Sequence, residues 1–328
     1  RKALEDSYNL ILQAVREQRA ITPAAEWLID NFHIIRAQLL DIRENLPPKY
    51  YRELPKLKDQ PFAGLPRVYG IAWAFVAHTD SLFEPELLAR FVRAYQTVQP
   101  LTIGELWAIA ITLRIVLIEN LRRLSDRIVK SQEGRKEADE IANEVLGLGE
   151  KTPRSISQIL DSLQNRNSGI AFYVQLLQRL HFQDSKVNPI LEWIDQRLTQ
   201  EQLHADNVVS IEHHSQTAAN ATVRNIITSF RLMSAYDWQD FFEDVSLVDQ
   251  TLRKGSMYPR MDFATRDRYR HALEQISRTS PLSQLEIAQK LIEASQATGV
   301  DPGFLLIDDG REEFEKMVQA PRSFGRRL

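Results

Sequence analysis

Apolar residues recur at intervals of three and four along almost the whole chain, which is the spacing of one face of an α-helix. One such stripe is formed by Leu87, Leu88, Phe91, Val92, Tyr95 and Val98. Glycine, which the turns of sheet-rich folds need, occurs only 12 times in 328 residues. The sequence therefore predicts an all-α fold, a multi-helix array of about fourteen to sixteen helices.

Several helix starts carry capping residues, whose side chains satisfy the free amides of a first helical turn. The pairs Thr22-Pro23 and Asp301-Pro302 place a cap before a proline, which suits the first turn of a helix. The segments 102–105 and 283–286 read Thr-Ile-Gly-Glu and Ser-Gln-Leu-Glu, the pattern of a capping box. These four positions are expected helix N-termini.

Two expected helices have apolar residues all round the axis, from Val68 to Ala77 and from Leu106 to Ile118. A helix without a polar face is buried on every side. Both are shorter than the ~20 residues that span a bilayer, so we expect core helices and no transmembrane segment. The sequence thus places these two helices at the centre of the first half of the chain.

Arg114 lies within the second of these helices and is expected to be buried. A buried guanidinium needs a carboxylate partner, because an unpaired buried charge costs several kcal/mol. The candidate structural charges that we expect near Arg114 are Asp80, Glu105 and Glu119.

The segment 147–153 contains two glycines and a proline, which interrupt the helical pattern. We therefore expect one helical subdomain over residues 1–148 and a second over residues 149–328. An alternative is that the second subdomain is continuous with the first.

The composition and the motifs exclude several kinds of function. The net charge of −3 does not suggest a nucleic-acid partner, and the absence of cysteine rules out disulfides and thiolate metal sites. The seven histidines form no His-Glu-x-x-His pair, and neither a nucleophile elbow nor a glycine-rich phosphate loop occurs. We expect no catalytic residue, no metal and no cofactor in this chain.

A run of aromatic, arginine and proline residues between positions 46 and 107 stands out instead. Aromatic faces and arginine side chains can bind sugar rings or a protein interface. The alternative is a set of proline-rich turns packed by their own aromatics. The candidate contact or sugar-binding residues are Tyr50, Tyr51, Arg67, Tyr69 and Trp107.

Segments along nearly the whole chain resemble the N-terminal cytoplasmic region of cyclic β-1,2-glucan synthases. The segments that carry this resemblance are 25–33, 50–51, 66–69, 100–107, 113–114, 119–123, 225–229, 237–243, 261–270 and 306–311. The strongest of them read Asp-Trp-Gln-Asp-Phe-Phe-Glu and Met-Asp-Phe-Ala-Thr-Arg-Asp-Arg-Tyr-Arg. Residues 130–200 match poorly.

The resemblance implies a place in a very large inner-membrane enzyme that polymerises glucose from UDP-glucose and cyclises the product. It implies a position before the first membrane segment, on the cytoplasmic face of the bacterial inner membrane, and a chain that is soluble by itself. The family's Asp-x-Asp and Gln-x-x-Arg-Trp motifs are missing, so none of the family's catalytic residues is expected here.

Three hypotheses about function follow. The first is an accessory or scaffolding domain that docks on the transferase portion of the same parent chain. The second is a module that binds the growing β-1,2-glucan, and the third is an independent helical enzyme that acts on glycosides. Bound sugar at residues 50–107 would separate the first two.

Overall fold

The computed structural model describes residues 1–148, 154–164, 166, 168–183, 185–254 and 256–320. Over these residues it contains seventeen α-helices, fourteen of them at least seven residues long, and no strand. An isolated β-bridge joins Lys56 to Pro66. The prediction of an all-α, multi-helix fold is confirmed.

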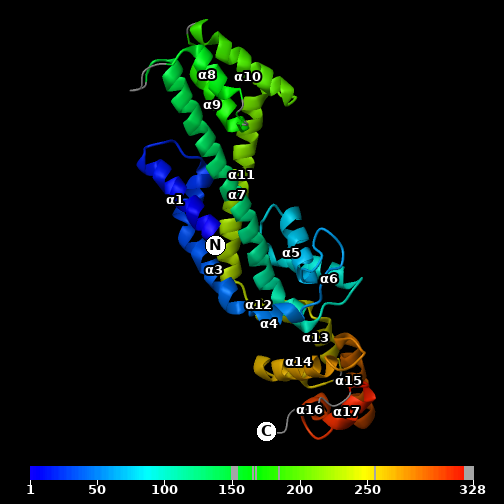
Figure 1. The fold of residues 1–328 in the computed structure, drawn as a ribbon. Coiled ribbons are helices and arrows are strands. Elements are labelled where there is room, and N and C mark those ends of the chain that lie inside the picture. Colours follow the sequence, from blue (N-terminus) through cyan, green and yellow to red (C-terminus); the bar gives the residue numbers. More distant parts are fainter. Residues whose placement is uncertain (149–153, 165, 167, 184, 255, 321–328) are drawn as a thin grey trace. The chain divides into compact units, whose positions relative to one another are not determined.

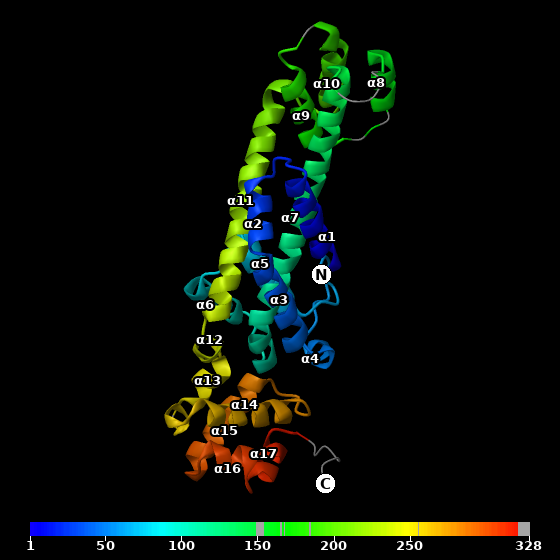
Figure 2. The same cartoon turned by 90° about the vertical axis from the view of Figure 1, so that its left-hand side faces the viewer.

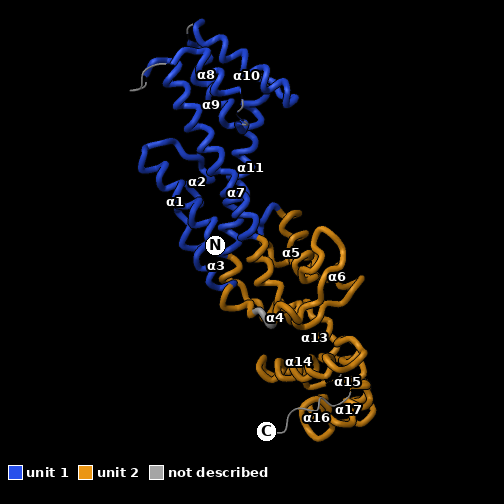
Figure 3. The backbone as a smooth tube through the Cα atoms, viewed as in Figure 1, with its two compact units in different colours: residues 1–42, 80–82, 117–231 blue, residues 43–79, 83–116, 232–328 orange. Residues whose placement is uncertain are grey.

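The chain forms two compact units, each assembled from segments that are far apart in the sequence (Figure 3). Unit 1 comprises residues 1–42, 80–82 and 117–231, and unit 2 comprises residues 43–79, 83–116 and 232–328. The division predicted between residues 148 and 149 stays a prediction, and residues 149–153 lie outside the described part of the chain.

Two long helices, α7 (Ile103–Val145) and α11 (Ala205–Ala235), contribute most of their length to unit 1, where they lie side by side (Figures 1 and 2). The other helices with residues in this unit are α1 (Lys2–Arg16), α2 (Pro23–Asp30), α3 (Phe32–Asn45), α8 (Ile156–Leu163), α9 (Ile170–Leu180) and α10 (Asn188–Gln200), with a 3₁₀ turn at Ser185–Val187. An apolar cluster joins α8, α9 and α10 to the end of α7 and the start of α11. Its most deeply buried residues include Phe172, Leu176, Ile190, Ile194 and Leu198.

The turn at Asp80 and Ser81 belongs to unit 1 and is fastened to both long helices. Thr222 donates to the Asp80 carboxylate at 2.9 Å, Ser229 donates to the Ser81 carbonyl at 2.8 Å, and Asn120 donates to the Ser81 hydroxyl at 2.8 Å. Both turn residues have positive φ, 48° and 65°, which is unfavourable for residues other than glycine. Asp80, expected as a buried charge, is exposed because it lies at the tip of this turn.

Unit 2 contains shorter helices. They are α4 (Pro48–Glu53), α5 (Arg67–His78), α6 (Pro85–Gln96), α12 (Trp238–Val245), α13 (Leu247–Leu252), α14 (Phe263–Ser277), α15 (Gln284–Thr298), α16 (Pro302–Ile307) and α17 (Arg311–Met317), with a 3₁₀ turn at Tyr258–Arg260. Helix α6 packs against α5 and α12, α15 packs against α13, α14 and α16, and α16 packs against α17. The first residues of α7, through residue 116, belong to this unit.

The predicted caps are present. The Ser283 hydroxyl accepts a hydrogen bond from the Glu286 amide, and the Glu286 carboxylate accepts one from the Ser283 amide at 2.7 Å. Thr22 caps α2, and Asp301 caps α16 by accepting from the Gly303 amide. Local sequence therefore fixes these helix starts, because each cap satisfies amides that the helix leaves free.

The two helices expected to be buried on all sides differ. In α7, no residue from 106 to 118 is exposed, as predicted. In α5, Ala77 is exposed and Trp73 keeps 40% of its surface open. The expectation for α5 is therefore corrected: an apolar side chain permits burial but does not require it, since much of any protein surface is apolar.

Candidate functional site

The five residues predicted to form a contact surface lie in unit 2, and each is half-buried: Tyr50, Tyr51, Arg67, Tyr69 and Trp107. Three of them, Tyr50, Arg67 and Trp107, are held around the first turns of α7. The other two, Tyr51 and Tyr69, lie beside side chains that remain open to solvent.

Arg67 opens α5 and pairs with Glu105 in the first turn of α7. Arg67 Nε donates to Glu105 Oε1 at 2.8 Å and Arg67 Nη2 donates to Oε2 at 2.6 Å, a two-point contact with a fully buried carboxylate. The same Oε2 accepts from the Thr102 amide at 2.9 Å, which completes the capping box predicted over residues 102–105. The Arg67–Glu105 pair thus joins the first residue of α5 to the first turn of α7.

Tyr50 and Trp107 also make internal contacts. The Tyr50 hydroxyl donates to the Gly104 carbonyl, and burial raises the pKa of this phenol above its ordinary value. The Trp107 ring stacks on Phe242, with 4.4 Å between centroids and 12° between planes. These two aromatic side chains therefore support the fold of unit 2.

A buried ionic network lies beyond Trp107 and was not foreseen from the sequence. Arg270 is 1% exposed and its guanidinium lies between two rings, 5.0 Å from the centroid of Phe242 and 4.9 Å from that of Phe263. Its Nη2 donates to Asp249 at 2.8 Å and to Glu243 at 2.5 Å. Helices α12, α13 and α14 are joined through this one side chain.

The residues of this network come largely from the segments 237–243 and 261–270, which carry the resemblance described above. The signal available in the sequence was the abundance of arginine, acid and phenylalanine in those two segments. Their pairing required the fold, because Glu243 and Arg270 are 27 residues apart.

An aromatic patch, defined as Phe62, Tyr69 and Trp73, is partly exposed on unit 2. The Phe62 ring lies 5.2 Å from Trp73 and 5.7 Å from Tyr69, so one ring of the preceding loop touches two rings of α5. The loop approaches α5 closely at Gly70, where a Cβ atom would lie 3.1 Å from the Leu57 side chain. Trp73 was missed because its helix was expected to be buried throughout.

The side chain of Lys56 lies over the ring of Tyr51. The Lys56 ammonium lies 4.1 Å from the Tyr51 ring centroid, a cation–π contact, and also donates to the Tyr51 carbonyl at 3.2 Å. An exposed lysine side chain therefore covers part of the Tyr51 ring.

Arg114 is 8% exposed, as expected for a residue of a core helix. Its guanidinium donates to the carbonyls of Ala110 and Met233, at 3.2 and 3.1 Å, and lies 5.9 Å from the Trp238 ring centroid. Arg114 thus joins α7 to the last turn of α11, within unit 2.

Glu119 belongs to unit 1 and is half-buried. Hydrogen bonds from Arg122, and then from Arg123, outweigh the effect of burial and lower the pKa of the Glu119 carboxyl to about 2. Glu119 is thus part of a charged cluster along one side of α7.

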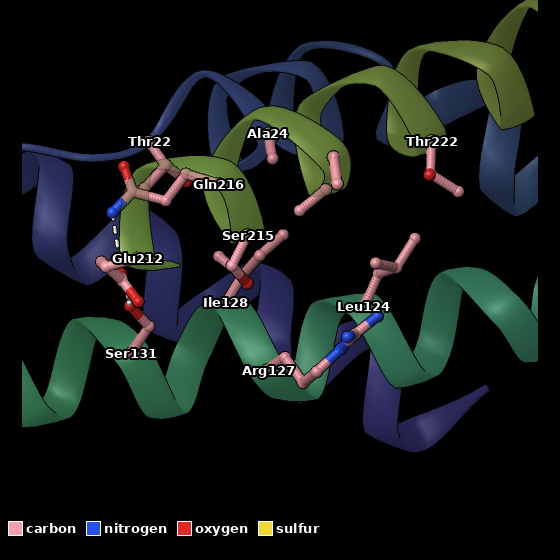
Figure 4. Close-up of a pocket in the computed structure, with 12 residues that line it drawn as sticks. Thr22, Ala24, Leu124, Arg127, Ile128, Ser131, Glu212, Ser215, Gln216 and Thr222 are labelled. Atoms are coloured by element: carbon pink, nitrogen blue, oxygen red, sulfur yellow. Dashed lines mark hydrogen bonds between the residues drawn. The ribbon is translucent and has the colours of Figure 1, made fainter. Parts of the chain in front are cut away.

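A hollow of about 170 Å³ lies in unit 1 among α2, α7 and α11 (Figure 4). Polar and small apolar side chains line it: Thr22, Ala24, Leu124, Arg127, Ile128, Ser131, Glu212, Ser215, Gln216, Ala218, Ala219 and Thr222. The lining residues of α7 and α11 recur at helical spacing, which the sequence could have shown as two faces. Their meeting could not be predicted, because Ser131 and Glu212 are 81 residues apart.

Glu212 organises one end of this hollow. Its Oε1 accepts hydrogen bonds from Arg135 at 2.9 Å, from Gln216 at 2.8 Å and from Ser131 at 3.4 Å. Figure 4 shows Ser131 and Gln216 reaching Glu212 from opposite helices. Glu212 is only 9% exposed, and three hydrogen-bond donors hold its carboxylate in place.

Two other features are absent from the residues described above, a metal-binding cluster and a membrane-spanning helix. No group of three or more His, Asp and Glu side chains there is arranged to hold a metal ion. Nor does that part of the chain contain a helix with the length and apolar character needed to cross a membrane.

No model of a known protein family matches the chain. The chain is nevertheless homologous to part of a much larger bacterial synthase. It is 35% identical over 286 residues to the cyclic β-(1,2)-glucan synthase NdvB of Rhizobium meliloti (strain 1021). This match covers 87% of the chain but spans only 10% of the relative. Homology to a segment of a cyclic β-1,2-glucan synthase is thus confirmed.

Proposed function

We propose that this chain is a non-catalytic accessory segment of a cyclic β-1,2-glucan synthase, which braces the transferase portion of the same parent chain. In this proposal it precedes the first membrane segment of the parent and lies on the cytoplasmic face of the inner membrane. There it adjoins the machinery that polymerises glucose from UDP-glucose.

The observation that carries the proposal is the 35% identity over 286 residues to a relative named for that synthesis. The match extends over most of the chain, so it concerns the helical array as a whole. The contacts of Arg67, Trp107 and Arg270 support a scaffolding role, because each joins separate helices of unit 2.

The docking surface in this proposal is the aromatic patch, with Tyr51 beside it. Exposed Trp and Tyr side chains supply large contact area at low cost in conformational entropy and are enriched among interface hot spots. Arg67, Tyr50 and Trp107 stabilise the fold of unit 2. In this proposal they affect docking only indirectly, by keeping the aromatic patch in place.

Co-purification tests the proposal. Residues 1–328 and the remainder of the parent synthase are expressed as separate chains in the same cells. Capture of the synthase remainder by the wild-type chain is expected, and Trp73→Ala with Tyr69→Ala is expected to abolish capture. Phe182→Ala is the matched control, since Phe182 is 91% exposed and lies outside the patch. Equal capture by all three chains would refute docking through the patch.

A second candidate function is the handling of the growing glucan. The observation that favours it is the polar lining of the hollow in unit 1, which contains hydroxyl, amide, carboxylate and guanidinium groups. Side chains of these types form the hydrogen bonds by which proteins hold small polar ligands.

A further inference from the structure

Free hydrogen-bonding capacity remains inside the hollow of unit 1. Glu212 Oε1 has three donors, whereas no described residue donates to Glu212 Oε2. This oxygen is not among the enclosed atoms of the described residues, so it is an accessible acceptor for a ligand. The side-chain carbonyl of Gln216 is a second acceptor, because its amide nitrogen is the atom engaged with Glu212.

Donors are available on both α7 and α11. Across the described chain, Arg127 makes neither an ion pair nor a hydrogen bond with another residue, so its guanidinium is free to donate. Its side chain extends along α7 toward Leu124 (Figure 4). Ser215 adds a hydroxyl that can both donate and accept.

This combination selects the chemistry of the ligand. An anion would satisfy Arg127 but would meet the unpaired oxygen of Glu212 with no proton to offer. A cation would meet Glu212 already paired with Arg135 and would also face Arg127. A neutral ligand with several hydroxyl groups satisfies both, because each hydroxyl donates one hydrogen bond and accepts others.

The size of the hollow and its apolar lining residues further restrict the kinds of ligand that would fit. A volume of about 170 Å³ is below the ~300–1,000 Å³ of pockets for drug-sized ligands, so the hollow suits one small ring. Its apolar lining residues, such as Ala24, Ile128 and Ala219, offer a surface for the C–H bonds of that ring.

We infer that the hollow among α2, α7 and α11 is a binding site for a single sugar ring, in which Arg127 and Glu212 hold the ring hydroxyls. The polyol chemistry rests on the hollow alone. The choice of glucose as the sugar rests on the proposed role of the chain in a glucan synthase. The site would hold one glucose unit of a β-1,2-glucan.

The test is titration of the full chain with D-glucose and with the disaccharide of two β-1,2-linked glucose units, followed by saturation-transfer NMR. Saturable binding of at least one sugar is expected. Arg127→Ala and Glu212→Gln are each expected to weaken it by at least ~10-fold, since each removes a hydrogen bond to a charged group. Ala218→Trp is expected to abolish binding by filling the hollow.

Lys130→Ala is the matched control for Arg127→Ala, since Lys130 is also an exposed cation on α7 but does not line the hollow. It should leave binding unchanged. Arg127→Ala should also keep the thermal midpoint of the parent, because Arg127 is exposed and has no partner to lose among the described residues. A loss of binding in this variant therefore cannot be ascribed to unfolding.

Three results would overturn the inference. They are no saturable binding of either sugar, equal binding by the parent, Arg127→Ala and Ala218→Trp chains, or tighter binding of inorganic phosphate than of sugar. The last would make the hollow an anion site. None of these results bears on whether the parent synthase needs the segment, so this inference and the proposed scaffolding role fail separately. The second candidate function, glucan handling at the hollow, would fail with the inference.

Discussion

Arg67 and Glu105 are joined by two hydrogen bonds, of 2.8 and 2.6 Å, although 38 residues separate them in the sequence. Glu105 has no exposed surface, and its carboxylate also caps α7 through Thr102. One buried acid therefore fixes both the start of a long helix and the position of the chain that enters α5.

Arg67→Ala is expected to lower the free energy of unfolding by ~3 kcal/mol or more, because it leaves the buried Glu105 carboxylate without its cation. Urea denaturation of the two chains measures the difference. The matched control is Arg278→Ala, whose exposed pair with Glu53 should contribute less than ~1 kcal/mol. Equal losses in the two variants would contradict a structural role for the Arg67 pair.

Trp107→Ala and Trp73→Ala are expected to separate support of the fold from contact with a partner. Loss of the Trp107 ring from its stack on Phe242 should destabilise the chain by ~2–3 kcal/mol. Loss of the exposed Trp73 ring should cost at most ~1 kcal/mol. Thermal unfolding of both variants decides the point, and a larger loss for Trp73→Ala would reverse the assignment.

Stability is expected to fall at acid pH partly through Glu243. Burial raises the pKa of this carboxyl, but hydrogen bonds from Arg266 and Arg270 outweigh burial and hold the pKa below its ordinary 4.5. A carboxyl with a lowered pKa in the folded state stabilises the protein fully above about pH 4.5, and this stabilisation is lost as the pH falls through the folded pKa.

The pH dependence is measured by urea denaturation in a series of buffers from neutral pH to about pH 3. Glu243→Gln should be less stable than the parent at neutral pH and should show a shallower decline on the acid side. Glu293→Gln is the control, since Glu293 is exposed on α15. A decline as steep in Glu243→Gln as in the parent would show that Glu243 does not contribute.

Arg114→Ala is expected to destabilise the chain by ~2–3 kcal/mol, because it removes buried charged hydrogen bonds to the carbonyls of Ala110 and Met233. The measurement is again urea denaturation, with Arg90→Ala as an exposed arginine control on α6. An Arg114→Ala chain as stable as the parent would remove Arg114 from the set of structural charges.

Local features of the fold could be predicted from the sequence. The capping boxes at Thr102 and Ser283 involve residues three apart, so the sequence contains both partners of each contact. The burial of α7 between residues 106 and 118 follows from an apolar pattern with no polar face.

The long-range contacts could not be predicted, because they depend on which helix faces which. Glu105 was recognised as a structural charge, but its pairing with Arg67 depends on how the start of α5 lies against the start of α7. Trp73 is exposed because no described residue covers one side of its ring, which the apolar character of the ring does not reveal. The hollow needs three helices in register, so neither Arg127 nor Glu212 was singled out.

The central claim is that this segment is needed for glucan synthesis although it performs no chemistry. The most direct measurement is polymer production by membranes that carry the parent synthase without the region equivalent to residues 1–328, compared with membranes that carry the full-length synthase. The account predicts lost polymer with normal expression and normal membrane insertion. Undiminished polymer, with expression and insertion equally normal, would contradict it.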